Sequence, residues 1–269
     1  MTVLSEVGRL ESSLRESRDA GRKLLVPYMT GGLPGWERAI EACAAAGADA
    51  IELGIPFSDP VIDGPTIQEA SERALAAGAT PQGIVGALGA IETGGVPLVV
   101  MTYYNTVHRY GHERFAASLV AAGVAGAIVP DLPLDEVGPW AAAADEAGVE
   151  TVLLAAPTGS DERLARICAR SRGFVYGVGL LGVTGERAEL ARSALSIARR
   201  LKSLTDKPVL IGIGVSNRAQ AAEVASVADG AVVGSAVVRR MLDGGGPEAV
   251  GAFVADLRAG LDGASAGHP

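Results

Sequence analysis

The sequence predicts an α/β protein that folds as a single (β/α)8 (TIM) barrel, and three observations support this prediction. Eight short aliphatic runs follow one another along the chain. These runs are nearly continuous in apolar character rather than alternating, which is typical of parallel strands buried on both faces. Stretches with helical periodicity separate them, and 269 residues is an ordinary length for one such barrel. An open, doubly wound sheet is the rival arrangement.

Each element is placed by its own local pattern. The eight expected strands lie within 24–32, 48–56, 96–104, 125–133, 151–159, 174–179, 208–214 and 230–236. Between them, stretches such as "WERAIEACAAAG" and "HERFAASLVAAG" repeat apolar residues every three or four positions and end at glycine, as helices do. Asp135, Ser160 and Ser216 precede apolar-periodic stretches, so we expect them to be helix N-caps.

One domain is expected over residues 1–269, with one helix added before the barrel. This polar helix lies in the amino-terminal segment 1–20, over residues 3–18, and residues 263–269 read as a frayed tail. No linker, charge run or low-complexity segment divides the chain. The expected architecture is therefore a barrel with an extra N-terminal helix.

Composition narrows the classes of function. Hydrophobic residues make up 48% and charged residues 20%, which is typical of a compact globular protein. A net charge of −8 disfavours nucleic acid and anionic membranes as partners. No apolar run reaches the length of about eighteen residues that a membrane helix requires, so a cytoplasmic location is expected. Cys43 and Cys168 are expected to pack inside helices, and no His/Cys cluster predicts a metal site.

The segment "IELGIPFSDPVIDGP" holds candidate acid–base residues. Glu52 lies inside an apolar run, so it must point into the barrel mouth, pair with a neighbour, or bind a proton more tightly because it is desolvated. Asp63 follows in a loop rich in glycine and proline, where it could instead form a turn or cap a helix, and Asp59 reads as a turn residue. Should the loop fold back, two carboxyl groups in different environments could divide acid and base roles.

Three glycine-containing strand ends later in the chain predict a phosphate site. They are "GLLGVTG", "IGIGVS" and "VVGSAV". Glycine lets backbone N–H groups approach a ligand closely, and Ser235 at the start of a short helix adds a hydroxyl and a positive helix end. Phosphate binding after the seventh and eighth strands recurs in such barrels.

On these motifs the sequence resembles the tryptophan synthase α-subunit family. "ELGIPFSDPVIDGPTIQ" is similar to the signature of that family, and "MTYYNTVHRYGHERF", "VPDLP", "GVTGER" and "VVGSA" follow in the family's order across residues 20–260. The resemblance implies a (β/α)8 barrel that cleaves indole-3-glycerol phosphate to indole and glyceraldehyde 3-phosphate by a retro-aldol reaction.

The resemblance also implies roles for individual residues. Glu52 matches the general acid–base, Asp63 the carboxylate that binds the indole N–H, and Tyr176 a residue that lines the site. The residues that match phosphate-binding positions are Gly185, Gly212, Gly214, Gly234 and Ser235. The remaining matches are Ile213 for an apolar contact with substrate, Thr184 for a loop that closes over the ligand, and Asp131 for a partner of that loop.

Partners and cofactors follow from the same resemblance. It implies no cofactor in this chain and a β-subunit, carrying pyridoxal phosphate, that receives indole in an α2β2 heterotetramer. Some positions depart from the commonest family pattern, namely Leu33, Ile62, Thr106, Gly179 and Leu180. Two alternatives therefore stay open, a stand-alone lyase that releases free indole and a non-catalytic allosteric activator of a β-subunit.

Other catalytic chemistries find less support in the sequence. A Schiff-base aldolase needs a lysine at a strand end, and none of the eight strand runs contains one. His108 and His112 lie outside those runs, so they are expected to be surface or capping residues rather than an acid–base pair.

Overall fold

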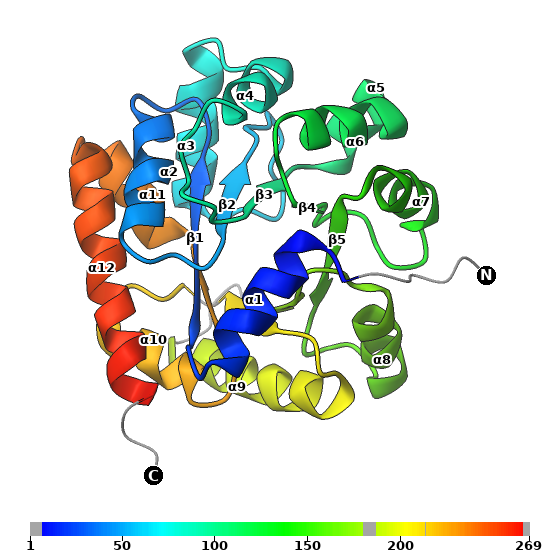
Figure 1. Cartoon of the computed structure of the whole chain (residues 1–269), viewed down its shortest axis with the longest axis vertical. Coiled ribbons are helices and arrows are strands. Elements are labelled where there is room, and N and C mark those ends of the chain that lie inside the picture. The colour runs from blue at the N-terminus through cyan, green and yellow to red at the C-terminus, as the bar shows by residue number, and fades with distance from the viewer. Residues whose placement is uncertain (1–6, 180–186, 213, 266–269) are drawn as a thin grey trace.

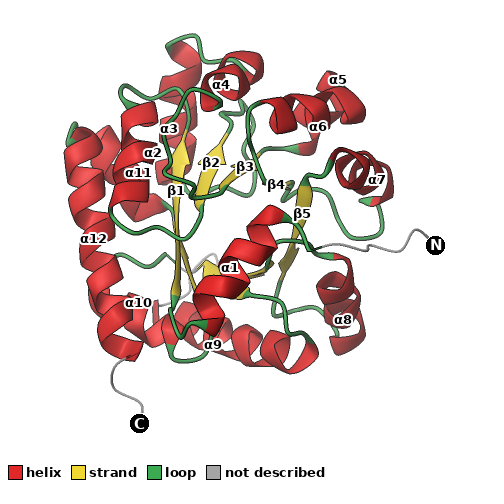
Figure 2. Ribbon diagram, in the orientation of Figure 1, coloured by secondary structure: helices red, strands yellow, loops and turns green. Residues whose placement is uncertain are grey.

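The eight strands form a closed parallel barrel in sequence order, β1 to β8, with β8 paired to β1 (Figures 1 and 2). The computed structural model describes residues 7–179, 187–212 and 214–265. The strands are β1 (Leu24–Thr30), β2 (Ile51–Gly54), β3 (Leu98–Met101), β4 (Gly126–Ile128), β5 (Glu150–Ala155), β6 (Val175–Val178), β7 (Val209–Gly212) and β8 (Gly230–Val233). The barrel is confirmed, and an open sheet is excluded because the ring of strand pairs closes.

Helices surround this barrel, as Figure 2 shows. Those before β5 are α1 (Arg9–Asp19), α2 (Trp36–Ala45), α3 (Pro65–Ala76), α4 (Pro81–Leu88), α5 (Tyr104–Tyr110), α6 (His112–Ala121) and α7 (Gly138–Ala147). Those after β5 are α8 (Asp161–Arg170), α9 (Arg187–Leu204), α10 (Arg218–Ala225), α11 (Ser235–Leu242) and α12 (Gly246–Ser265). Pairs of helices follow β2, β3 and β8, whereas the sequence pattern predicts one helix after each strand.

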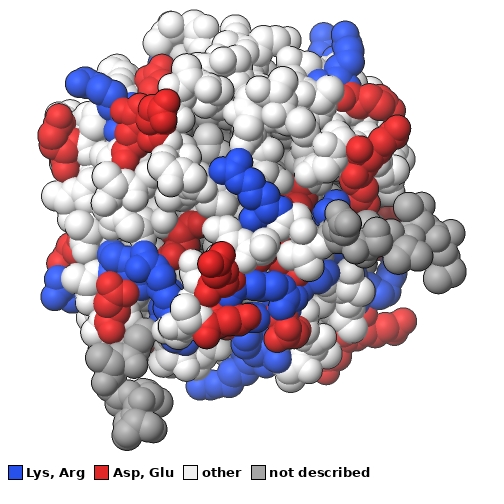
Figure 3. All heavy atoms as spheres, viewed as in Figure 1, with Lys and Arg blue, Asp and Glu red and all other residues white. Residues whose placement is uncertain are grey.

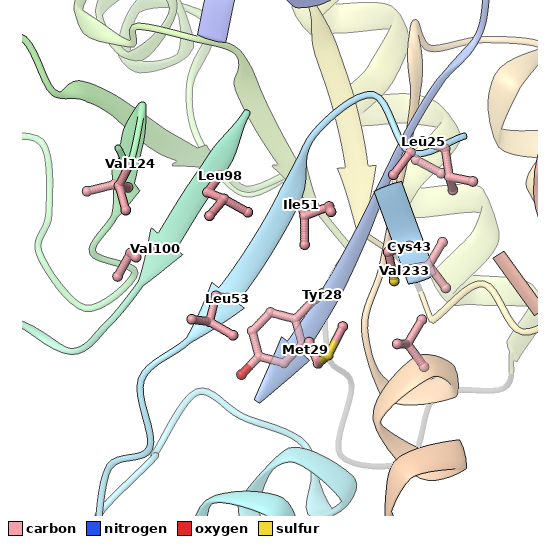
Figure 4. Packing of buried hydrophobic residues seen from close by; sticks show 14 of the residues in the cluster. Leu25, Tyr28, Met29, Cys43, Ile51, Leu53, Leu98, Val100, Val124 and Val233 are labelled. Atoms are coloured by element: carbon pink, nitrogen blue, oxygen red, sulfur yellow. The ribbon is translucent and has the colours of Figure 1, made fainter. Parts of the chain in front are cut away.

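The core has two layers because neighbouring residues of a strand point to opposite faces. Ala50 of the β2 segment packs inside the barrel with residues such as Val26 and Leu210. Ile51 and Leu53 face outward, toward the helices, in a second cluster that Figure 4 shows in part. This alternation places Glu52, between Ile51 and Leu53, on the inner face.

Helix α1 lies across the barrel (blue in Figure 1) and packs against its interior. Leu10 and Leu14 are fully buried in the inner cluster, together with Phe174. The buried Glu150 carboxylate, at the start of β5, accepts the N–H groups of Leu10 at 2.6 Å and Glu11 at 3.0 Å. A side chain 140 residues away in sequence therefore caps the helix that precedes the barrel.

Three expected N-caps have different outcomes. Ser160 is confirmed, because its hydroxyl accepts the N–H of Arg163 and α8 begins at the next residue. Ser216 is wrong by one position, since Asn217 caps α10. Asp135 is wrong, because α7 starts after Val137 and the Asp135 carboxylate pairs with arginines of α8 instead.

The helices nearest the two ends of the chain differ in their bounds from those expected, whereas both cysteines lie inside helices as expected. Within the described residues the first helix begins at Arg9, and α12 continues to Ser265, three residues into the expected tail. Cys43 in α2 and Cys168 in α8 are buried free thiols, as expected. In the part of the chain that the structure describes, no helix combines the length and apolar character needed to cross a membrane.

Charged side chains of both signs intermingle around α1 on the face shown in Figure 3. Arg15 of α1 pairs at 2.7 Å with Asp206, which lies between α9 and β7, and Arg18 of α1 pairs with Asp19 at 2.8 Å. Ion pairs this exposed contribute little to stability. They do distribute charge, so that acidic and basic groups alternate on this face rather than forming a region of one sign.

Candidate active site

Glu52 is a buried acid in the barrel mouth that has no hydrogen-bond partner among the described residues. Its side chain is 0% exposed, and neither carboxylate oxygen bonds any residue that the structure describes. Burial, and then the nearby Asp63 charge, raise the pKa of Glu52 to about 8. The sequence left open a carboxylate satisfied by a neighbouring group, and no described residue provides such a group. Glu52 holds its proton at neutral pH and is suited to general acid catalysis.

Asp63 lies in the loop between β2 and α3, close enough for its charge to act on Glu52. It does not cap α3, because that helix starts from Gly64 without a side-chain cap. The Tyr103 hydroxyl donates to Oδ2 of Asp63 at 3.2 Å. Burial raises the pKa of Asp63 to about 6, and the bond from Tyr103 opposes that rise. At neutral pH this second acid is ionised while the first is protonated, as division of labour requires.

Two further tyrosines lie on the inner wall near Glu52. Tyr28, labelled in Figure 4, is directly paired with Glu52 across β1 and β2. Directly paired residues of neighbouring strands point to the same side of a sheet. A Cβ added at Gly54 would lie 2.0 Å from the Tyr28 hydroxyl. Tyr176 on β6 is half-buried, and burial, then Glu52, raises its pKa well above the ordinary value.

The expected phosphate side is formed by the ends of β7 and β8. Gly234 immediately precedes α11, and Ser235, its first residue, is exposed. Helix α11 therefore directs its free backbone N–H groups toward the mouth, where an anion could bind them. Gly214 has φ +67°, a conformation that favours glycine. A Cβ at Gly212 would lie 2.7 Å from the Tyr176 ring, so this glycine makes room for that ring.

The remaining predicted site residues have different outcomes. Thr184, Gly185 and Ile213 lie outside the described residues. Asp131, after β4, accepts the backbone N–H of Tyr104 at 2.8 Å and so fixes the start of α5. Among the described residues, no group of three or more His, Cys, Asp or Glu side chains could hold a metal ion.

Sequence reasoning missed Tyr28 and Tyr103. Both stand inside expected strands, Tyr28 in 24–32 ("LLVPYMTGG") and Tyr103 in 96–104 ("VPLVVMTYY"), toward the carboxyl ends where barrel chemistry occurs. The feature of the sequence that could have indicated them is a tyrosine near the end of a strand that is otherwise aliphatic. Such a tyrosine indicates a site residue only when the acids are known to lie near it.

A separate cavity of about 350 Å³ lies between the ends of β4 and β5 and helix α8. Its walls are mainly apolar, with Leu132, Leu154 and Leu164 among them, and Arg163 is its ionisable residue. Because it contains neither acid, it is a poorer candidate for proton transfer than the barrel mouth.

A closed (β/α)8 barrel with a protonated and an ionised carboxyl in its mouth defines the class of barrel enzymes that carry out acid–base chemistry. Comparison with known proteins identifies the family. The family model described as "Tryptophan synthase alpha chain" matches residues 14–252. The chain belongs to the tryptophan synthase alpha chain family.

Individual relatives are similar over nearly their whole length. The tryptophan synthase alpha chains of Streptomyces coelicolor and Thermobifida fusca are 47% and 44% identical to this chain over 262 residues, which is 94% of this chain and 97% of each relative. A solved structure of tryptophan synthase from Mycobacterium tuberculosis has a TM-score of 0.87 at 41% identity, covering 95% of this chain and 99% of that one.

Proposed function

We propose that this chain cleaves indole-3-glycerol phosphate to indole and glyceraldehyde 3-phosphate, acting as a carbon–carbon lyase. The observation that supports this most is the pair of acids at one strand end, one protonated and one ionised at neutral pH. Relatives that are tryptophan synthase alpha chains by name favour this reaction over a stand-alone lyase and over a non-catalytic activator.

In this reaction Glu52 is the general acid and then the general base. Its carboxyl proton goes to indole C3, and the positive charge moves to the ring nitrogen. The resulting carboxylate removes the proton of the hydroxyl on the carbon attached to C3. The bond between that carbon and C3 then breaks, its electron pair returns to the ring, and an aldehyde forms. Glu52 ends protonated, ready for another turnover.

Asp63 stabilises the charge that develops on indole. As an ionised carboxylate it accepts a hydrogen bond from the indole N–H, and that bond strengthens when the nitrogen becomes positive. Tyr103 occupies Oδ2, which leaves Oδ1 for the substrate. Tyr176, on β6, lines the mouth across the barrel from β2.

The phosphate end of the substrate binds at the ends of β7 and β8, beyond β1 from the acids of β2 and its loop. Gly234 and Ser235 offer the start of α11, and Gly212 and Gly214 shape the end of β7. We assign Thr184 to the loop that closes over the ligand. The same family resemblance assigns Gly185 to the phosphate site and Ile213 to a contact with the substrate.

We propose a β-subunit as the partner of this chain. Indole is apolar and would diffuse away, so direct transfer to a partner retains it. Pyridoxal phosphate belongs to that β-subunit in an α2β2 heterotetramer, and this chain uses no cofactor of its own. We place the pair in the cytoplasm.

The test is to incubate the purified chain with indole-3-glycerol phosphate and follow indole release, alone and with a β-subunit. Turnover that rises strongly with the partner supports the synthase subunit. High turnover alone, unchanged by the partner, would instead support the stand-alone lyase. Absence of indole under both conditions rules out the aldolase.

A further inference from the structure

Tyr103 holds the loop that carries Asp63 through two bonds from one hydroxyl group. Its oxygen accepts the backbone N–H of Ile62 at 3.1 Å, and its proton is donated to Oδ2 of Asp63 at 3.2 Å. A phenol has one proton, so the Asp63 oxygen must be the acceptor in this arrangement. The contact therefore favours ionised Asp63 in one orientation.

Tyr103 is itself firmly placed. Its side chain is 5% exposed, and its ring stacks on Phe57 with centroids 4.9 Å apart and planes 20° apart. The next residue, Tyr104, donates its backbone N–H to Asp131 at 2.8 Å. A rigid strand end thus presents the phenol to a loop whose Asp63 is only half-buried.

The other titratable groups whose charges act with Asp63 cannot replace this contact. They are Glu52 on β2, Tyr28 on β1 and Tyr176 on β6. Among the described residues, Tyr103 is the group that bonds the Asp63 carboxylate. Glu52 has no hydrogen-bond partner in the same set, so it gives Asp63 no donor.

We propose that Tyr103 is a positioning residue for the cleavage reaction, whose phenol orients the Asp63 carboxylate by bonding both that carboxylate and the backbone before it. This inference rests on the proposed function. Oδ1 of Asp63 then faces the indole N–H, while Tyr103 need not touch the substrate at all.

The first experiment is Tyr103→Phe, which keeps the ring and its stacking on Phe57 and removes the hydroxyl. We expect kcat/KM for indole-3-glycerol phosphate to fall about ten- to a hundredfold, the range for losing a hydrogen bond to a charged group. The acid limb of the pH profile should move to higher pH, because Asp63 loses the bond that favours its ionised form. Tyr110→Phe is the matched control, since Tyr110, the last residue of α5, packs against Phe115 and bonds neither Asp63 nor Ile62 among the described contacts.

A second experiment separates positioning from substrate contact. We expect Asp63→Asn to lower turnover severely, because the substitution removes the charge that stabilises the indole N–H. In that background Tyr103→Phe should cause little further loss, because the two residues act as a unit. In the resting protein without substrate, Tyr103→Phe should also speed hydrogen–deuterium exchange of the Ile62 amide, which loses its acceptor.

Failures of the two ideas are distinguishable. A wild-type chain that releases no indole overturns the proposed function and the catalytic part of this inference. An active wild type with unchanged kcat/KM, acid limb and exchange in Tyr103→Phe overturns the inference alone. A fall in kcat/KM that is additive with Asp63→Asn, with unchanged exchange, would make Tyr103 a substrate contact and also overturn it.

Discussion

Glu52 and Asp63 differ in their hydrogen bonding, and this difference separates their chemistry. Glu52 is fully buried on the inner wall and bonds none of the described groups, so desolvation favours its neutral form. Asp63 is half-buried and accepts a phenol proton, which favours its charged form. Two acids on one strand-and-loop unit can therefore carry opposite charge states at the same pH.

Glu52→Gln should abolish turnover while leaving binding of a phosphate ester almost unchanged. Glutamine keeps the shape of the side chain but cannot transfer a proton, and the phosphate side is built from other strands. Indole release measures the first effect, and calorimetry with glyceraldehyde 3-phosphate measures the second. Glu113→Gln, at an exposed position on α6, is the control. Turnover like that of the wild type in Glu52→Gln would contradict the acid–base role.

The same substitution should stabilise the protein at neutral pH. The pKa of Glu52 rises from 4.5 to about 8 on folding, so below pH 4.5 both states are protonated and burial carries no ionisation penalty. Between 4.5 and about 8 the unfolded chain loses its proton more readily, and the free energy of unfolding falls. Glutamine does not titrate. At pH 7 we expect Glu52→Gln to gain on the order of 2 kcal/mol.

Urea denaturation at several pH values measures this gain. The difference between Glu52→Gln and wild type should be small near pH 4 and grow toward pH 8. A difference that does not change with pH would mean that Glu52 ionises as easily in the folded protein as in the unfolded chain. Stability gained as activity is lost is the expected relation at a functional site.

At the scale of elements, local sequence patterns predict the strands well, because the property that makes a segment a buried strand is visible in the segment itself. A strand buried on both faces needs continuous apolar residues, and "ADAIELGIP" and "PVLIGIG" display that need in their own sequence. The same patterns do not predict contacts between distant segments. Tyr103 bonds Asp63, which is 40 residues away in sequence. Asp135 pairs with arginines 28 and 31 residues away instead of capping a helix.

The contact between Glu150 and helix α1, which joins segments distant in sequence, leads to a testable prediction. Glu150→Ala removes the carboxylate that accepts two N–H groups at the start of α1, and leaves those donors buried without a partner. We expect the free energy of unfolding to fall by about 1 to 3 kcal/mol, the cost of a lost cap and of unsatisfied donors. Turnover by the folded protein should be retained, because Glu150 contacts α1 and neither acid of the mouth.

Chemical denaturation and indole release together check this prediction. Glu146→Ala is the matched control, since Glu146 is exposed near the end of α7. A Glu150→Ala variant as stable as the control would show that α1 is held by its buried leucines alone. Loss of turnover in the folded variant would show instead that α1 influences the active site.

At the scale of the whole molecule, barrel closure brings the two halves of the site together. The acids come from the β2 strand and its loop, early in the chain, whereas the expected phosphate side comes from β7 and β8. Pairing of β1 with β8 joins these parts, and a Cβ at Gly234 would lie 3.5 Å from the Tyr28 ring. The site therefore exists only in the complete barrel, and its assembly depends on the cooperative fold rather than on a local motif.

The rim of the mouth carries apolar side chains that the barrel itself leaves uncovered. Val61 is 83% exposed, and Ile62 beside it is 37% exposed. Adjacent exposed apolar residues are favourable places for a partner to bind. Because both lie on the loop that carries Asp63, a β-subunit seated on this rim would contact the loop and restrict its motion. A substitution at Val61 can therefore distinguish an effect on β-subunit binding from an effect on catalysis.

Val61→Lys should weaken β-subunit binding and the accompanying rise in turnover by about tenfold or more, the loss caused by a charge in the centre of an interface. Turnover without the partner should stay within about twofold, since an exposed side chain contributes little to the fold. Indole release titrated with β-subunit measures both quantities. Val120→Lys is the control, because Val120 is 47% exposed near the end of α6. The end of that helix lies away from the carboxyl ends of the strands, where the mouth is. Equal partner affinity in the two variants would place the β-subunit elsewhere, and loss of basal turnover in Val61→Lys would show that Val61 shapes the Asp63 loop directly.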